Sequence, residues 1–116
     1  MKQETVSALS DELALKLPAN TQILGVERQQ GMDDMVRTKL RLTRTDFEQF
    51  RASVPVPEDV MEDDAGALLG PGPAWWKPPA NARVGQAPVG NGRVLHLGIE
   101  DAGSGNVIVY LVNHGT

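Results

Sequence analysis

Six consecutive apolar residues near the end of the chain limit its possible folds most strongly: Val107, Ile108, Val109, Tyr110, Leu111 and Val112. A helix that spans a membrane needs about eighteen or more such residues, so the run is predicted to be a buried β-strand. Alternate side chains of a strand point to opposite faces of its sheet, and both faces are apolar here. Such a strand is typical of a sheet centre that is covered on both sides. If helices cover one side, either the chain's long loop or a second subunit must cover the other.

The first part of the chain predicts a helix and a hairpin. Apolar residues at spacings of three and four predict a helix within residues 6–16, which Pro18 ends. Residues 21–28 and 35–42 predict two paired strands, the second with alternating character. Its three basic residues are expected on a solvated outer face: Arg37, Lys39 and Arg41.

A second helix and a second hairpin follow the same rules. Thr45 and Glu48 match the capping-box pattern and predict a helix over residues 46–53. Residues 93–100 and 107–113 predict strands joined by a glycine-rich turn.

The segment between these units, residues 55–92, holds seven of the eight prolines. No long regular element tolerates this density of proline. A loop of this length is either functional or fixed to the domain by its two tryptophans, and the sequence leaves both interpretations open. We therefore predict one α+β domain over residues 1–116. It has a four-stranded antiparallel sheet of two hairpins, two helices packed on one face, and this long Pro/Gly-rich loop.

The charges of the chain are unevenly distributed. Eleven basic and fifteen acidic residues give a net charge of −4, which disfavours nucleic acid and favours a basic partner. Five acidic residues lie in one short run: Glu58, Asp59, Glu62, Asp63 and Asp64. The run does not follow the D-x-[DN]-x-[DN]-G pattern of a calcium loop. It is therefore either a solvated loop or a surface that docks on a basic partner.

Two adjacent tryptophans, Trp75 and Trp76, precede a lysine and two prolines in a chain with five aromatic residues. One interpretation is that an indole folds back over the sheet and fixes the loop. The other is an exposed aromatic anchor, because tryptophan is enriched among the residues that dominate binding interfaces. We expect one tryptophan in the core and the other at a partner.

Motifs of catalysis, metal binding and export are missing from the sequence. It has no cysteine and two histidines, His96 and His114, and neither has a companion ligand at metal-binding spacing. Neither a G-x-S-x-G elbow nor a phosphate loop occurs. We therefore expect a non-enzymatic protein with no metal and no cofactor. The first residues lack the apolar stretch of a secretory signal, which predicts a cytoplasmic location.

Four short segments carry a resemblance to a known group of proteins. They are Leu17-Pro18-Ala19-Asn20, Leu42-Thr43-Arg44-Thr45-Asp46-Phe47, Trp75-Trp76-Lys77-Pro78 and Val109-Tyr110-Leu111. Their order resembles small uncharacterised bacterial α+β proteins, many of them lipoprotein-like, although the chain lacks the cysteine that carries their lipid. In its size, acidity and lack of cysteine, the chain is also similar to immunity proteins that neutralise toxins.

These observations favour a bacterial immunity protein that binds and neutralises a basic toxin domain. The partner-binding residues expected are the five acidic residues of the run together with Trp75 and Trp76. The alternative is a lipoprotein-like domain that binds a small ligand or is associated with the cell envelope, with residues 55–92 as a lid. A homodimer that covers the second face of the sheet is a third possibility.

Overall fold

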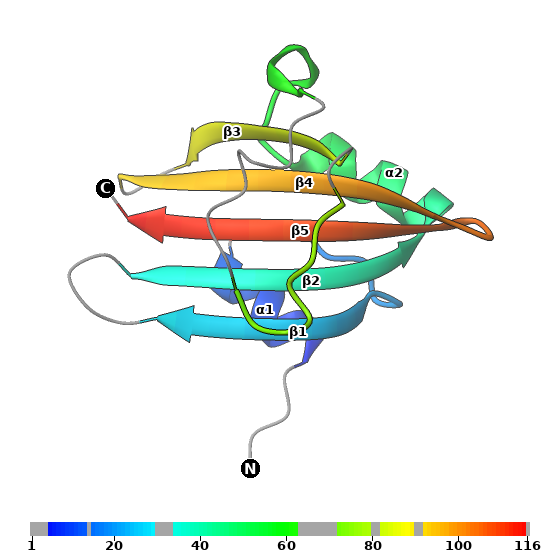
Figure 1. Cartoon of the computed structure of the whole chain (residues 1–116), viewed down its shortest axis with the longest axis horizontal. Coiled ribbons are helices and arrows are strands. Elements are labelled where there is room, and N and C mark those ends of the chain that lie inside the picture. The colour runs from blue at the N-terminus through cyan, green and yellow to red at the C-terminus, as the bar shows by residue number, and fades with distance from the viewer. Residues whose placement is uncertain are drawn as a thin grey trace.

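A five-stranded antiparallel sheet forms the centre of the molecule, as a computed structural model shows (Figure 1). The structure describes residues 5–13, 15–29, 34–62, 72–79, 82–89 and 92–115. The strands lie in the order β1-β2-β5-β4-β3. Their bounds are β1 Gln22–Gln29, β2 Met35–Thr43, β3 Arg83–Val89, β4 Arg93–Gly103 and β5 Asn106–Gly115.

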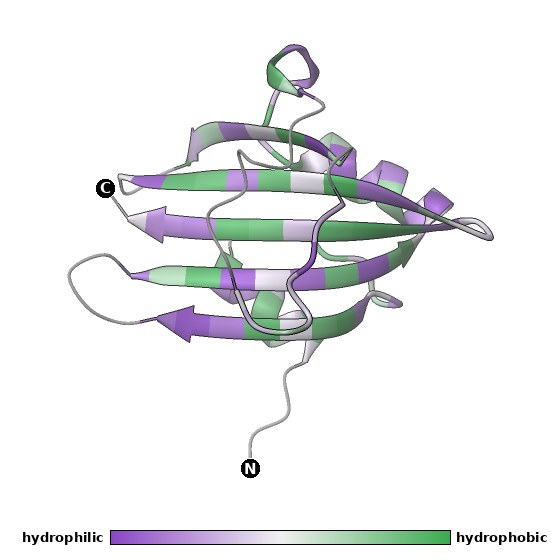
Figure 2. Cartoon of the chain, in the orientation of Figure 1, coloured by the Kyte–Doolittle hydropathy of each residue, from purple (hydrophilic) through white to green (hydrophobic). Residues whose placement is uncertain are grey.

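The apolar strand predicted near the C-terminus is the central strand, which confirms that prediction. β5 pairs with β2 on one side and with β4 on the other, over nearly its whole length. Every residue from Val107 to Val112 is buried. Figure 2 shows β5 as hydrophobic along most of its length, whereas its neighbours alternate. Burial on both faces is what a strand without polar alternation requires.

Two helices, α1 (Val6–Leu13) and α2 (Arg44–Ser53), lie behind the sheet in the view of Figure 1. Their buried residues Leu9, Leu13 and Phe50 join the inward-facing residues of the strands in one core. The predicted placement of both helices on one face is therefore confirmed. Within the described part of the chain, no helix has the length and apolar character that a membrane crossing needs.

The predicted sheet of four strands is wrong by one strand, because β3 lies inside the segment predicted as a loop. Among the described strands β3 pairs with β4 and forms an edge of the sheet, with one isolated bridge from Glu62 to Val84 on its other side. Pro88 is tolerated on such an edge without the loss of a ladder hydrogen bond. Gly85 leaves room for the side chain of Met61, whose sulfur would lie 2.6 Å from a Cβ at that position. A proline and a glycine in seven residues hid this strand in the sequence.

The predicted helix limits also need correction. The side chain of Thr43 accepts a hydrogen bond from the Asp46 amide at 3.2 Å, so α2 begins at Arg44 with Thr43 as its N-cap. Thr45, the predicted cap, lies inside the helix. The first helix ends at Leu13, three residues early, where the Ser10 hydroxyl donates to the Leu15 carbonyl. The amide of Leu15 donates to the carbonyl of Ser10 at 3.1 Å, five positions back, which is not the four-residue spacing of an α-helix.

Candidate functional site

The front of the sheet is covered by residues 72–79, here called the Trp segment. Figure 1 shows this yellow-green segment in front of the sheet, on the side opposite the helices. Trp76 is 5% exposed and meets the ring of Tyr110 edge-on, with 5.3 Å between the ring centres. It joins a second core of front-face residues: Ala82, Val84, Ile108, Tyr110 and Val112. Residues of the long loop therefore pack on this face of the sheet, and a homodimer stays a prediction.

The basic stripe predicted on a solvated face lies partly under this cover, which corrects the prediction. Arg37 is 6% exposed, and its Nη1 lies 2.5 Å from Oε1 of Glu27. Its guanidinium carbon is 5.9 Å from the centre of the Trp76 ring. Lys39 donates to the backbone carbonyl of Trp75 at 2.9 Å. Arg37 and Lys39 thus hold the Trp segment against the sheet, whereas Arg41 is exposed as predicted.

Trp75 is half-buried and lies over the backbone of β1. A Cβ built at Gly25 would lie 2.6 Å from Cε3 of its indole, so only glycine permits this contact. The two tryptophan rings meet edge-on, with 6.1 Å between their centres. The structure thus confirms that one tryptophan, Trp76, is in the core. Trp75 retains some surface at the β1 edge of the sheet, and its contact with a partner stays a prediction.

The hydroxyl of Tyr110 forms hydrogen bonds that help to hold the Trp segment on the sheet. It donates to Oε1 of Glu100 at 2.7 Å and lies 3.3 Å from the backbone carbonyl of Lys77. Burial raises the pKa of Tyr110, and the carboxylate of Glu100 raises it further. The hydroxyl therefore stays protonated at neutral pH and acts as a hydrogen-bond donor.

The acidic run begins in a turn of residues 58–62, here called the acidic turn, which contains the short 3-10 helix η1 (Glu58–Val60). Glu58 pairs with two arginines: Arg83 at 2.7 Å and Arg51 at 2.9 Å. The hydrogen bond from Arg83 is the largest cause of a lowered pKa at Glu58. Two backbone hydrogen bonds of 2.7 Å join Glu62 to Val84 of β3. The turn is thus held at both of its ends, at Glu58 by α2 and β3 and at Glu62 by β3.

Other residues of the acidic turn, unlike the paired Glu58, have side chains that a partner could contact. Asp59, Val60 and Glu62 are all exposed. Among the described residues, Val60 is one of two large apolar side chains with more than a third of their surface open. Asp63 and Asp64, which continue the predicted docking surface, lie outside the described residues. In Figure 1 the turn, in green, extends beyond β3 at the edge of the molecule.

The predicted partner-binding residues do not form one patch. The acidic turn is bonded to β3 and Trp75 lies on β1, and these two strands are the opposite edges of the sheet. Four strand spacings separate them, which is about 19 Å. An interface centred on one of these groups therefore places the other at its rim or outside it.

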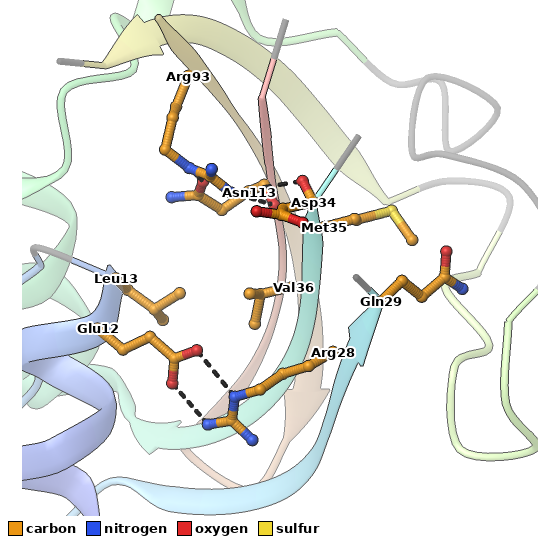
Figure 3. A pocket seen from close by; sticks show the side chains of 9 residues that line it. All are labelled: Glu12, Leu13, Arg28, Gln29, Asp34, Met35, Val36, Arg93 and Asn113. Carbon is orange, nitrogen blue, oxygen red and sulfur yellow. Dashed lines mark hydrogen bonds and ion pairs between the residues drawn. The ribbon is translucent and has the colours of Figure 1, made fainter. Parts of the chain in front are cut away.

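A cavity of about 340 Å³ opens between α1 and one end of the sheet (Figure 3). Leu13 and Val36 line its middle. At one end Arg28 donates through Nε and Nη2 to the two carboxylate oxygens of Glu12, at 2.8 and 2.5 Å. This hydrogen bonding lowers the pKa of Glu12. Neither charged residue was singled out from the sequence, because the two lie sixteen positions apart in different elements.

The opposite end of the cavity is formed by Arg93 and Asn113. Arg93 donates from Nε to Oδ1 of Asn113 at 2.5 Å, and its Nη2 lies 3.5 Å from the backbone carbonyl of Asp34. Asn113 is 6% exposed, so this end is held by a buried amide. Gln29 and Met35 complete the lining. The cavity thus has an apolar middle and an arginine at each end, and apolar walls with a few polar groups are typical of small-ligand sites.

His96 and His114, which the sequence left without companions, meet on the front face. Their Nε2 atoms are 2.9 Å apart, and the rings stack with 5.0 Å between their centres. The register of the second hairpin places them diagonally, since His96 lies opposite Val112 and His114 opposite Val94. The predicted strand bounds left this register open, so the sequence did not bring the two histidines together. Among the described residues, no group of three or more possible metal ligands occurs.

Comparison with protein-family models, with curated proteins and with solved structures found no match in any of the three.

Proposed function

We propose that the chain is a non-enzymatic, cytoplasmic binding domain that docks on a basic protein through its acidic turn, as an immunity protein docks on its toxin. The observation that carries this proposal is that the acidic turn extends beyond β3 at the edge of the sheet, with Asp59, Val60 and Glu62 exposed in it. Acidic side chains around an exposed apolar residue suit a partner with basic residues around an apolar pocket.

The rigidity of the acidic turn supports the proposal. Glu58 is paired with Arg51 and Arg83, and Glu62 exchanges two backbone hydrogen bonds with Val84. A segment that is ordered before binding loses less conformational entropy when it binds. Because two arginines neutralise Glu58, the attraction of a basic partner falls mainly to Asp59 and Glu62 within the described residues.

The tryptophans contribute less to this proposal than the sequence suggested. Trp76 is 5% exposed and has almost no surface for a partner. Trp75 lies on the far edge of the sheet from the acidic turn. Val60, which is 42% exposed and lies within the turn, is the better candidate for the apolar contact.

The test compares two charge-reversal variants of the full chain. Asp59→Lys with Glu62→Lys alters the acidic turn, and Asp11→Lys with Glu48→Lys changes the net charge equally at exposed positions on the two helices. Each immobilised protein is incubated with lysate of the source bacterium, and captured proteins are identified by mass spectrometry. We expect a basic protein that the wild type and the helix variant retain and that the turn variant loses.

Association and dissociation rates of the captured protein then separate long-range electrostatic attraction from the apolar contact. Reversal of the turn charges is expected to slow association on the order of tenfold at low salt, with a smaller effect at high salt. Val60→Ser is expected to speed dissociation instead. The proposal fails if the helix variant loses the captured protein as fully as the turn variant, or if neither variant changes its capture.

A second candidate function, the binding of a small ligand, is supported by the cavity between α1 and the sheet. Arg28 and Arg93 lie at its two ends with an apolar middle between them, which suits a short apolar molecule with an acidic group. A thermal-shift screen of small carboxylates tests it. Ligands that stabilise the wild type and not Arg93→Gln would support this function, and equal stabilisation of both proteins would contradict it.

A further inference from the structure

The two histidines of the chain form a geometrically defined pair on neighbouring strands. His96 belongs to β4 and His114 to β5, and each strand is held in the sheet by partners on both sides. His96 is 6% exposed, and its Nε2 lies 2.9 Å from Nε2 of His114. Backbone pairing therefore fixes the positions from which both imidazoles reach toward each other.

The hydrogen bonds of the pair assign its protons. Nδ1 of His114 lies 2.9 Å from the backbone carbonyl of Gly115, which can only accept, so that nitrogen carries the proton. Nε2 of neutral His114 then has a lone pair, and Nε2 of His96 donates to it. Burial lowers the pKa of His96, and the neighbouring His114 lowers it further.

We propose that His96 and His114 bind one divalent transition-metal ion, such as Cu²⁺ or Ni²⁺, through their Nε2 atoms. Neutral imidazole is a suitable ligand for these ions. Metal-to-imidazole bonds are about 2.0–2.1 Å long, so two nitrogens 2.9 Å apart subtend an angle of about 90° at the metal. That angle is the one between adjacent ligands in square-planar and octahedral coordination and is narrower than the tetrahedral angle.

The surroundings of the pair support metal binding at Nε2. The bond from His114 Nδ1 to the Gly115 carbonyl is the second contact that orients most metal-bound histidines. His96 becomes a ligand when its ring proton moves from Nε2 to Nδ1, which leaves the lone pair of Nε2 for the metal. Arg37, on the same face and opposite Val112, is paired with Glu27, which offsets its charge.

The test is a titration of the full-length chain with Cu²⁺, followed by calorimetry and by electron paramagnetic resonance. We expect one ion per chain and a spectrum with splittings from two imidazole nitrogens. Since the sequence has two histidines and no cysteine, these splittings can come only from this pair. His96→Gln and His114→Gln are each expected to weaken binding about tenfold or more. Gln86→Ala, opposite His96 and with both imidazoles kept, is the matched control and binds as the wild type does.

Two further measurements keep the test independent of folding defects and of the N-terminal amine. The double variant His96→Gln with His114→Gln keeps the amine, so binding equal to that of the wild type would overturn the proposal. In the unsubstituted chain, Ni²⁺ is expected to broaden the imidazole NMR signals of both histidines at substoichiometric amounts. Sharp signals from either ring at a full equivalent of Ni²⁺ would likewise overturn it.

Discussion

The two faces of the sheet are covered in different ways, and the difference decides what the sequence reveals of each. Behind the sheet lie two helices, whose apolar residues recur at helical spacing. In front lies the Trp segment, eight residues without regular structure. Both covers bury their face, yet only the first has a periodic pattern. A central strand that is apolar on both faces predicts that both faces of the sheet are covered. It does not show which residues form a cover that has no regular secondary structure.

The largest effects are expected from removing the principal aromatic side chain of either cover. Phe50→Ala on the helix face and Trp76→Ala on the front face should each lower the free energy of unfolding by about 3–5 kcal/mol, because both residues are buried. Urea denaturation followed by circular dichroism measures both values. A loss below about 1 kcal/mol for Trp76→Ala would show that the front cover is not part of the core.

The next effect sharpens the contact between the Trp segment and β1. Gly25→Ala places a methyl group against the Trp75 ring and is expected to cost about 1–3 kcal/mol. Gly115→Ala is the control, because its nearest neighbour would be 3.8 Å from the new carbon. In a double-mutant cycle, Trp75→Ala should remove most of the cost of Gly25→Ala. Additive costs would mean that the indole does not lie on Gly25.

A smaller effect distinguishes two threonines at the start of α2 on the helix face. Thr43→Ala removes the side chain that accepts from the Asp46 amide and is expected to cost about 1 kcal/mol. Thr45→Ala lies within the helix and should change stability by less than about 0.5 kcal/mol. Denaturation midpoints measure both. The reverse order would restore the capping box predicted from the sequence.

The smallest effect is a pH dependence that belongs to the front face. The pKa of His96 is lowered in the folded chain. As the pH falls below the ordinary histidine pKa of about 6.5, the unfolded chain therefore binds more protons than the folded chain does. The contribution of His96 to the free energy of unfolding is therefore fully present above that pH and is lost as the pH falls through it. The fall between pH 7 and pH 5 should be shallower in His96→Gln. An identical profile in the variant would assign the dependence to the carboxylates.

The sequence was sufficient to predict those helices and strands whose apolar residues recur at the spacing of the element. The alternation of β2 and the apolar run of β5 predicted both strands to within two residues at each end. β3 was missed because Pro88 and Gly85 interrupt it, and an edge strand tolerates both. Arg37 was expected in solvent because its cover, the Trp segment, contacts it across 39 positions of sequence.

The candidate sites depended on strand order more than on residue type. The acidic run and the tryptophans were recognisable, but only the order β1-β2-β5-β4-β3 places them at opposite edges. The histidine pair depends on the register of the second hairpin, in which His96 lies opposite Val112, and the predicted strand bounds did not fix that register. The cavity between α1 and the sheet had no sequence pattern, since its charged residues come from four separate elements or their flanks.

The most direct test of the central claim, that the chain covers the front of its own sheet with the Trp segment, is a proton NMR spectrum of the unsubstituted protein. Nuclear Overhauser effects between the Trp76 indole and the Tyr110 ring are predicted, because the ring centres are 5.3 Å apart. The Hα signals of Gly25 are predicted to shift upfield, since the face of the Trp75 ring lies on that residue. Random-coil shifts at Gly25, with no contact between Trp76 and Tyr110, would contradict the account.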